Sequence, residues 1–347
     1  MGVGVDMEIA SPPPPRVCVT GAGGFIASWL VKLLLSRGYA VHATVRNPGD
    51  PKNAFLKQLD KASENLRIFK ADVLDYDTLT AAFAGCEGVF HPASPVPAEK
   101  MEDPEEKVLA PTVKGTANVL KACTATEVRK LIVVSSVAAS CFDPSWPEDK
   151  LKDETCWTDK QLCMETENWY SLAKTEAEEM ALEHAKENGL HVVTILPGLV
   201  IGPMLQNVVL NTTSQVLLYI IKGGPETINN KFWPLVDVRD VVDAMFLAYQ
   251  KAESSGRYIC ALDQMDIKDL VVLMKSMYPN YNYVDKMADV DYKVETTSGK
   301  LKSLGWKPRK LEETLADSIE YFEKAGLLQD EEEPCRLPYF YRVTAEQ

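Results

Sequence analysis

The chain lacks the features that mark metalloproteins, nucleic-acid-binding proteins and membrane proteins. Its four histidines, at positions 42, 91, 184 and 191, show no metal-ligand spacing, so we predict no metal site. Its 37 basic residues are outnumbered by 50 acidic ones, and the net charge of −13 disfavours nucleic acid and anionic membrane surfaces as partners. No apolar run is long enough to span a bilayer.

Targeting signals and regular cysteine spacing are also missing. The first residues, Met1–Asp6, have neither the basic region nor the apolar region of a secretory signal peptide. The eight cysteines are scattered along the chain, which fits reduced thiols. The scattered thiols therefore predict a cytoplasmic protein.

What the chain does have is a regular alternation of short apolar runs and helical patterns. The expected strands are residues 17–19, 39–45, 67–70, 88–90, 131–134, 191–196 and 257–261. The expected helices are residues 25–34, 78–84, 108–123, 170–188 and 237–250. Strands that alternate with helices at this interval predict an α/β fold, a Rossmann doubly wound parallel sheet with a smaller C-terminal substrate-binding lobe.

Composition changes divide the chain into segments. Residues 1–15 end in four prolines and predict a disordered leader. Residues 16–202, joined by 235–262, form the expected NADP-binding Rossmann domain. Residues 203–234 and 263–328 are less regular and form the expected substrate-binding lobe, in which Asp266 begins a helix. The acidic residues 329–347 are expected to be a solvated tail.

A glycine-rich turn joins the first strand to the first helix. Gly21 and Gly24 stand three residues apart, and Phe25 and Ile26 open the helix. Glycine permits a tight turn and lets backbone amides approach a pyrophosphate at the positive end of the helix. The turn therefore predicts a dinucleotide cofactor.

The end of the second strand selects between the two nicotinamide cofactors. An acidic residue at this position would bind an adenosine 2′-hydroxyl, but here the strand ends at Arg46, and Lys52 follows. Two cations can neutralise a 2′-phosphate, so we predict NADP(H). The alternative is that Arg46 and Lys52 are ordinary surface charges.

The remaining expected cofactor contacts lie where later strands end. They are Asp72, Val73, Pro92, Ala93, Ser94, Ser135, Pro197, Val200 and Thr213.

Tyr170 and Lys174 lie one helical turn apart in an expected helix. Residues i and i+4 share a helix face, so the phenol and the ammonium can point into one site. A neighbouring cation is expected to lower the pKa of the phenol and to improve it as a proton donor. Ser135 and Ser136 close the strand 131–134 and add a hydroxyl at the same sheet edge. We predict Tyr170 and Lys174 to be catalytic together with a hydroxyl from this serine pair; a helix-surface pair is the alternative for Tyr170 and Lys174.

This combination resembles the extended class of the short-chain dehydrogenase/reductase superfamily, over nearly the whole chain. More narrowly it is similar to the plant cinnamoyl-CoA reductases and their dihydroflavonol-reductase relatives. The segments that carry the resemblance are Thr20–Trp29, Val45–Pro48, Asp153–Trp157, Asn168–Tyr170, Leu199–Pro203, Val236–Val241 and Lys302–Trp306.

The resemblance implies that Ser136, the second of the serine pair, is the third catalytic residue beside Tyr170 and Lys174. It also implies NADPH-dependent reduction of a phenylpropanoid carbonyl, with hydroxycinnamoyl-CoA the first expected substrate. An aldehyde or ketone reductase of the same family is the alternative, and a non-catalytic NADP-binding protein is a third. The expected substrate contacts are Pro95, Val96, Met204, Gln206, Val216, Tyr219 and Trp233.

The chain departs from the cinnamoyl-CoA reductase pattern at several positions. Ser171, Leu172 and Ala173 replace the Cys, Tyr and Gly between the catalytic Tyr and Lys. Val216 and Tyr219 replace a His and a Lys that hold CoA phosphates in the family. The resemblance also implies that Cys156 and Cys163 can form a disulfide; two reduced thiols are the alternative.

Overall fold

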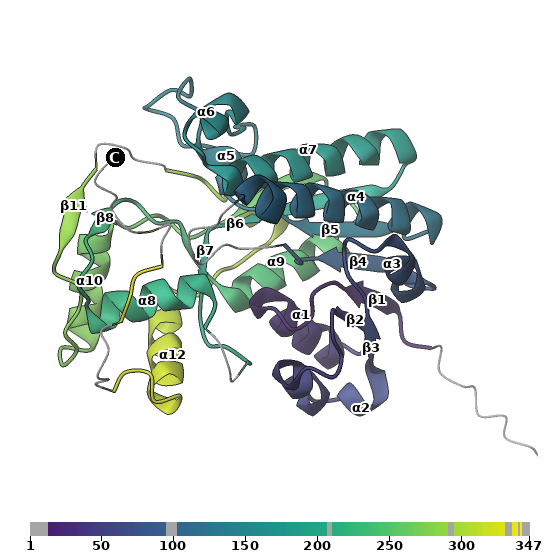
Figure 1. Ribbon diagram of the computed structural model, residues 1–347, viewed down its shortest axis with the longest axis horizontal. Coiled ribbons are helices and arrows are strands. Elements are labelled where there is room, and N and C mark those ends of the chain that lie inside the picture. Colours follow the sequence, from purple (N-terminus) through teal and green to yellow (C-terminus); the bar gives the residue numbers. More distant parts are fainter. Residues whose placement is uncertain are drawn as a thin grey trace, which may run out of the picture.

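A seven-stranded parallel sheet organises the computed structural model, which describes residues 13–94, 103–206, 210–290, 295–329, 335–338 and 341 (Figure 1). The strand order is β10-β6-β5-β4-β1-β2-β3, and every pairing is parallel. The strands are β1 (Arg16–Val19), β2 (Ala40–Val45), β3 (Leu66–Lys70), β4 (Gly88–His91), β5 (Lys130–Val134), β6 (His191–Pro197) and β10 (Gly256–Cys260). This order is that of a doubly wound Rossmann sheet, so the fold prediction is confirmed.

Helices cover both faces of the sheet because its strands are apolar on both sides. On one face α1 packs against α9, and on the other α4 packs against both α3 and α7 (Figure 1). Their bounds are α1 (Phe25–Ser36), α3 (Tyr76–Phe83), α4 (Ala110–Ala125), α7 (Trp169–Asn188) and α9 (Val238–Gln250). Shorter pieces between them are η1 (Pro51–Gln58), α2 (Ala62–Asn65), a π-helical turn η2 (Glu105–Leu109), α5 (Ala138–Cys141) and α6 (Lys160–Glu165).

A second hydrophobic core lies beside the sheet, under helices α8, α10 and α12 (Figure 1). The sequence did not predict α8, whose apolar face is fully buried in this core. Asp266 caps α10 by accepting a hydrogen bond from the amide of Asp269 (2.8 Å), as expected. The elements here are β7 (Leu199–Ile201), α8 (Thr212–Lys222), β8 (Ile228–Asn230), β9 (Leu235–Asp237), α10 (Ile267–Met277), β11 (Met287–Asp289) and α12 (Leu311–Lys324).

Two segments pack differently from the sequence prediction. Helix α11 (Gly299–Leu304) was expected in the smaller lobe, but Leu301 and Trp306 are buried against the Rossmann core. The Trp306 indole also donates to the carbonyl of Asp240 in α9 (2.9 Å). Near the C-terminus, Leu337 is fully buried in the second core, so the expected solvated tail is wrong at that position. In both segments, removing large apolar side chains from water lowers the free energy of the folded state.

Candidate functional site

The glycine turn has the geometry that a pyrophosphate-binding loop requires. Gly21 has φ +62°, and a Cβ there would lie 2.9 Å from the Cβ of Ala93. Gly24 is the N-cap of α1 and has no side chain to cap it. The first amides of α1, on Phe25 and Ile26, therefore face the turn without intrahelical acceptors. This turn can receive an anion at the positive end of the helix.

The end of β2 carries the two predicted cations. Arg46 directly follows β2 and is exposed. Lys52 lies in η1, with its side chain 58% exposed, and forms an ion pair with Asp50 (3.1 Å). Asp50 also caps η1 through the Lys52 amide (3.1 Å), so its carboxylate is already engaged. Arg46 is left as an exposed cation at the strand end.

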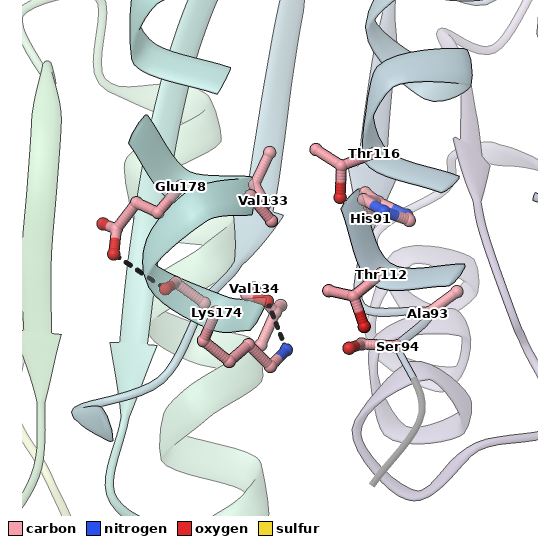
Figure 2. A pocket seen from close by; sticks show the side chains of 11 residues that line it. His91, Ala93, Ser94, Thr112, Thr116, Val133, Val134, Lys174 and Glu178 are labelled. Carbon is pink, nitrogen blue, oxygen red and sulfur yellow. Dashed lines mark hydrogen bonds between the residues drawn. The ribbon is translucent and has the colours of Figure 1, made fainter. Parts of the chain in front are cut away.

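A small cavity lies between β4, β5, α4 and α7 (Figure 2). Ser94 and Thr112 lie on one side of it, and their buried hydroxyls have no hydrogen-bond partner among the described residues. Lys174 and Glu178 line the other side. Unpartnered buried hydroxyls are costly unless a ligand satisfies them. The cavity therefore fits a polar ligand rather than an apolar one.

The three predicted catalytic residues come together at the carboxyl end of β5. Tyr170 and Lys174 lie in the first turns of α7, where Asn168 caps the helix through the amide of Ser171 (3.3 Å). The Lys174 ammonium donates to the carbonyl of Val134 (3.3 Å) and lies 5.8 Å from the Tyr170 ring centre. The hydroxyl of Ser136 hydrogen-bonds the Tyr170 phenol.

The electrostatics of this group differ from the sequence expectation. Burial raises the pKa of Tyr170, and the Ser136 hydrogen bond only partly offsets that effect. Burial lowers the pKa of Lys174 to about 8, while the charge of Glu178 opposes that shift. The prediction that Lys174 lowers the Tyr170 pKa is therefore wrong for this structure, because desolvation dominates for both groups. The phenol is protonated at neutral pH and can act as a proton donor.

Glu178 is a functional candidate that the sequence reasoning missed. It lies four residues after Lys174 on the same face of α7, and this spacing was the available signal. Its carboxylate accepts hydrogen bonds from the hydroxyls of Ser135 (2.8 Å) and Thr194 (2.5 Å) and from Arg257 (3.0 Å). All four side chains are at most 5% exposed. The network ties β5, β6 and β10 to α7.

Other predicted cofactor residues occupy varied surroundings. Ser135 is held by Glu178 and does not point freely into the site. Asp72 caps its own turn through the amide of Leu74 (2.9 Å), and Val73 contacts Gly115 of α4. The amide of Ala93 donates to the Thr20 hydroxyl (3.4 Å).

The remaining four of these residues lie at the ends of β4 and β6, in β7 and in α8. Pro92 directly follows β4, and Pro197 ends β6. Val200 lies in β7, and the Thr213 hydroxyl donates to its carbonyl.

The predicted substrate residues occupy different surroundings. The side-chain amide of Gln206 donates to the carbonyl of Gly23 in the glycine turn (3.1 Å). Met204 is buried, and Trp233 is 3% exposed in the second core. Val216 and Tyr219 are fully buried in the second core, so their prediction as substrate contacts is wrong. Their face of α8 packs inward because it carries the helix's apolar stripe. Pro95 and Val96 lie outside the described residues.

These observations fit a nicotinamide dinucleotide. In the glycine turn, Gly21 lacks the Cβ that would collide with Ala93, and the first amides of α1 face the turn without intrahelical acceptors. A model of the NAD dependent epimerase/dehydratase family matches residues 17–261, which span the sheet and all three catalytic candidates. The chain belongs to this family.

Within this family, the chain is similar to several plant reductases. Cinnamoyl-CoA reductase 1 of Petunia hybrida is 43% identical over 318 residues, covering 90% of this chain and 93% of the relative. Tetraketide alpha-pyrone reductase 1 of Arabidopsis thaliana is 38% identical over 323 residues, covering 90% and 97%. The predicted resemblance to plant cinnamoyl-CoA reductases is confirmed.

Solved structures agree with this placement. Vestitone reductase from alfalfa superposes with a TM-score of 0.77 at 30% identity, covering 90% of this chain and 99% of that structure. A yeast methylglyoxal/isovaleraldehyde reductase complexed with NADPH gives a TM-score of 0.77 at 26% identity, with the same coverage.

Several other sequence predictions can be compared with the described residues. Cys156 and Cys163 are both free and buried there, so no disulfide joins them in this structure. No cluster of three or more potential metal-ligating side chains occurs in the described ranges. Among the helices that the structure describes, none is both long and apolar enough to cross a membrane.

Proposed function

We propose that this protein is an NADPH-dependent reductase of phenylpropanoid carbonyl groups. The observation that carries the proposal is the meeting of Ser136, Tyr170 and Lys174 at the carboxyl edge of a Rossmann sheet. The plant cinnamoyl-CoA reductases among the relatives support the substrate class. The NADPH complex among the solved structures supports the cofactor.

The residues that would hold NADPH are those of the glycine turn and the β2 end. Gly21, Gly24 and the first amides of α1 would receive the pyrophosphate. Arg46 and Lys52 would receive the 2′-phosphate, with Arg46 the stronger candidate because Lys52 is paired with Asp50. When bound, NADPH supplies a hydride to a carbonyl carbon.

The chain itself supplies the proton and the polar surroundings. Tyr170 is the proton donor to the carbonyl oxygen, and its raised pKa keeps it protonated at neutral pH. Ser136 hydrogen-bonds the phenol and can also donate to the oxygen as negative charge develops there. Lys174 is held at the sheet edge by the carbonyl of Val134, where its ammonium can bind a ribose hydroxyl.

The first candidate substrate is a hydroxycinnamoyl-CoA thioester, which would give the hydroxycinnamaldehyde. After reduction, the tetrahedral carbon would release CoA as the thiolate and become the aldehyde carbonyl. This candidate rests on the cinnamoyl-CoA reductase relatives.

The second candidate is a free aldehyde or ketone, which would stop at the alcohol. The burial of Val216 and Tyr219 favours it, because neither residue can bind a CoA phosphate from inside an apolar core. Vestitone reductase, a structural relative, agrees with a free carbonyl substrate.

Assays of NADPH oxidation distinguish the thioester substrate from the free aldehyde or ketone substrate. The purified protein is given feruloyl-CoA, coniferaldehyde and a dihydroflavonol in parallel. Turnover of feruloyl-CoA supports the first candidate, and turnover of only the free carbonyl compounds supports the second. Absence of any turnover would contradict the proposed function.

The mechanism has a separate test in Tyr170→Phe. Loss of the general acid should lower kcat by about 10²- to 10⁴-fold while the Kd for NADPH stays nearly unchanged. Full activity in this variant would exclude Tyr170 as the proton donor. We also propose a cytoplasmic location, which the scattered positions of the cysteines along the sequence support.

A further inference from the structure

The chain near its C-terminus is anchored to the second core rather than free in solvent. Leu337 is fully buried there, and its amide donates to the Glu226 carboxylate (3.5 Å). The guanidinium of Arg336 pairs with the same carboxylate (3.1 Å). The carbonyl of Cys335 packs close to Gly224, where an added Cβ would lie 2.7 Å from it. These contacts fix the path of residues 335–338.

From this anchor the chain brings Tyr341 onto Trp233. The two ring centres lie 5.1 Å apart with an interplanar angle of 31°. The ammonium of Lys231 lies 5.9 Å from the Tyr341 ring centre and 6.0 Å from that of Trp233. Trp233 is 3% exposed, yet its indole N–H has no hydrogen-bond partner in the described part of the chain. We call Lys231, Trp233 and Tyr341 the aromatic cluster.

Backbone contacts place the aromatic cluster at the edge of the sheet that carries the catalytic residues. Pro234, next to Trp233, accepts a hydrogen bond from the amide of Leu199 (2.7 Å). Its carbonyl oxygen would lie 1.8 Å from a Cβ added at Gly198, so only glycine fits there. Gly198 and Leu199 directly follow β6, and the end of β6 accepts the amide of Val137 (3.0 Å). Val137 is the residue after Ser136.

The electrostatics agree with this placement. Burial and the neighbouring phenol of Tyr170 both raise the pKa of Tyr341. Burial also lowers the pKa of Lys231, so this ammonium is partly desolvated. The phenol of Tyr341 is therefore within electrostatic range of the Tyr170 phenol, the proton donor of the proposed reaction.

We propose that Tyr341, together with Trp233 and Lys231, forms a wall of the substrate site and selects a planar aromatic carbonyl compound that bears a ring oxygen. The proposal rests on the proposed function and names the part of the chain that recognises the ring. The Tyr341 ring offers an aromatic contact. The Lys231 ammonium, beside both rings, offers a donor for a ring hydroxyl or methoxyl oxygen.

The experiment compares an aromatic with an aliphatic enal in wild type, Tyr341→Ala, Tyr341→Leu and Tyr341→Phe. For coniferaldehyde, the Ala and Leu variants should raise KM about tenfold, which corresponds to the loss of one aromatic contact. For 2-hexenal, KM should change by less than about twofold, because that substrate has no ring to stack. Tyr341→Phe keeps the ring and should stay close to wild type with coniferaldehyde.

Matched controls separate recognition from a fold defect. Tyr76→Ala, at the exposed start of α3, should leave both KM values unchanged. The Kd for NADPH should be equal in all variants. An equal rise in KM for both enals, or no rise for coniferaldehyde, would overturn the proposal.

A binding measurement keeps this inference separate from the proposed function. Calorimetry of coniferaldehyde with the NADP⁺-loaded protein needs no turnover. Weaker binding in Tyr341→Ala supports the wall even if no carbonyl compound is reduced, an outcome that would contradict only the proposed function. Binding equal to wild type, or absent from wild type itself, would overturn the inference.

Discussion

At the scale of single residues, desolvation controls the chemistry of the site. Tyr170 and Lys174 were expected to interact mainly through charge, but burial moves both pKa values in the direction of the neutral form. Tyr170 is thereby kept as a proton donor, while Lys174 loses its proton at about pH 8. The carboxylate charge of Glu178, one helical turn further along α7, raises the Lys174 pKa and so opposes the effect of burial.

We expect the pH profile of kcat/KM for carbonyl reduction to be level below pH 8 and to fall above it. The reason is that Lys174 titrates with a pKa of about 8, whereas Tyr170 stays protonated to higher pH. Glu178→Gln should move the fall to lower pH, because the carboxylate charge that raises the Lys174 pKa is removed. A profile that falls at the same pH in both proteins would exclude Lys174 as the titrating group.

Cofactor choice is a second property of single residues. Arg46→Asp should raise KM for NADPH by at least about tenfold and shift preference toward NADH, because a charge-assisted hydrogen bond is replaced by repulsion. Lys52→Ala should have a smaller effect, since Lys52 already pairs with Asp50. Steady-state kinetics with both cofactors measure the change; an unchanged NADPH preference in Arg46→Asp would refute the 2′-phosphate role.

At the scale of elements, one buried ion pair joins the strands that form the site. Glu178 of α7 and Arg257 of β10 pair at 3.0 Å, and Arg257 also donates to the carbonyls of Cys156 (2.6 Å) and Ala139 (3.0 Å). The segment that carries Cys156 is thus tied to the helix that carries Tyr170. Such a pair sets geometry more than it adds stability.

Breaking this ion pair should destabilise the protein strongly. Arg257→Met should lower the free energy of unfolding by about 3–5 kcal/mol, because it leaves the Glu178 carboxylate buried and unpaired. The double variant with Glu178→Gln should recover part of that loss, since no uncompensated charge remains. Urea unfolding of the single and double variants measures this coupling; strictly additive losses would contradict it.

At the scale of the whole molecule, the site lies where the Rossmann sheet meets a second apolar core (Figure 1). The second core contains Val216 and Tyr219, the positions for which the family resemblance implied CoA-phosphate contacts. In this chain those positions point inward. We therefore expect substrate choice to depend on how the two cores pack and not on the catalytic residues alone.

Restoring the family's clamp residues should not create a thioester site. Val216→His with Tyr219→Lys should leave KM for feruloyl-CoA unimproved and lower the free energy of unfolding by several kcal/mol, because it places polar groups in a sealed core. Val272→Lys, on the exposed face of α10, is a matched control that should be neutral. A marked fall in KM for the thioester in the double variant would show that α8 can turn toward the substrate.

The sequence by itself determined the sheet, the glycine turn and the meeting of Ser136, Tyr170 and Lys174. These features depend on local patterns: apolar runs, a glycine spacing and a one-turn helical spacing. Tertiary structure alone decided that Val216 and Tyr219 are buried, that Glu178 pairs with Arg257 and that Tyr341 reaches Trp233. Glu178 and Arg257 lie 79 residues apart, and only packing of the intervening elements brings such side chains together.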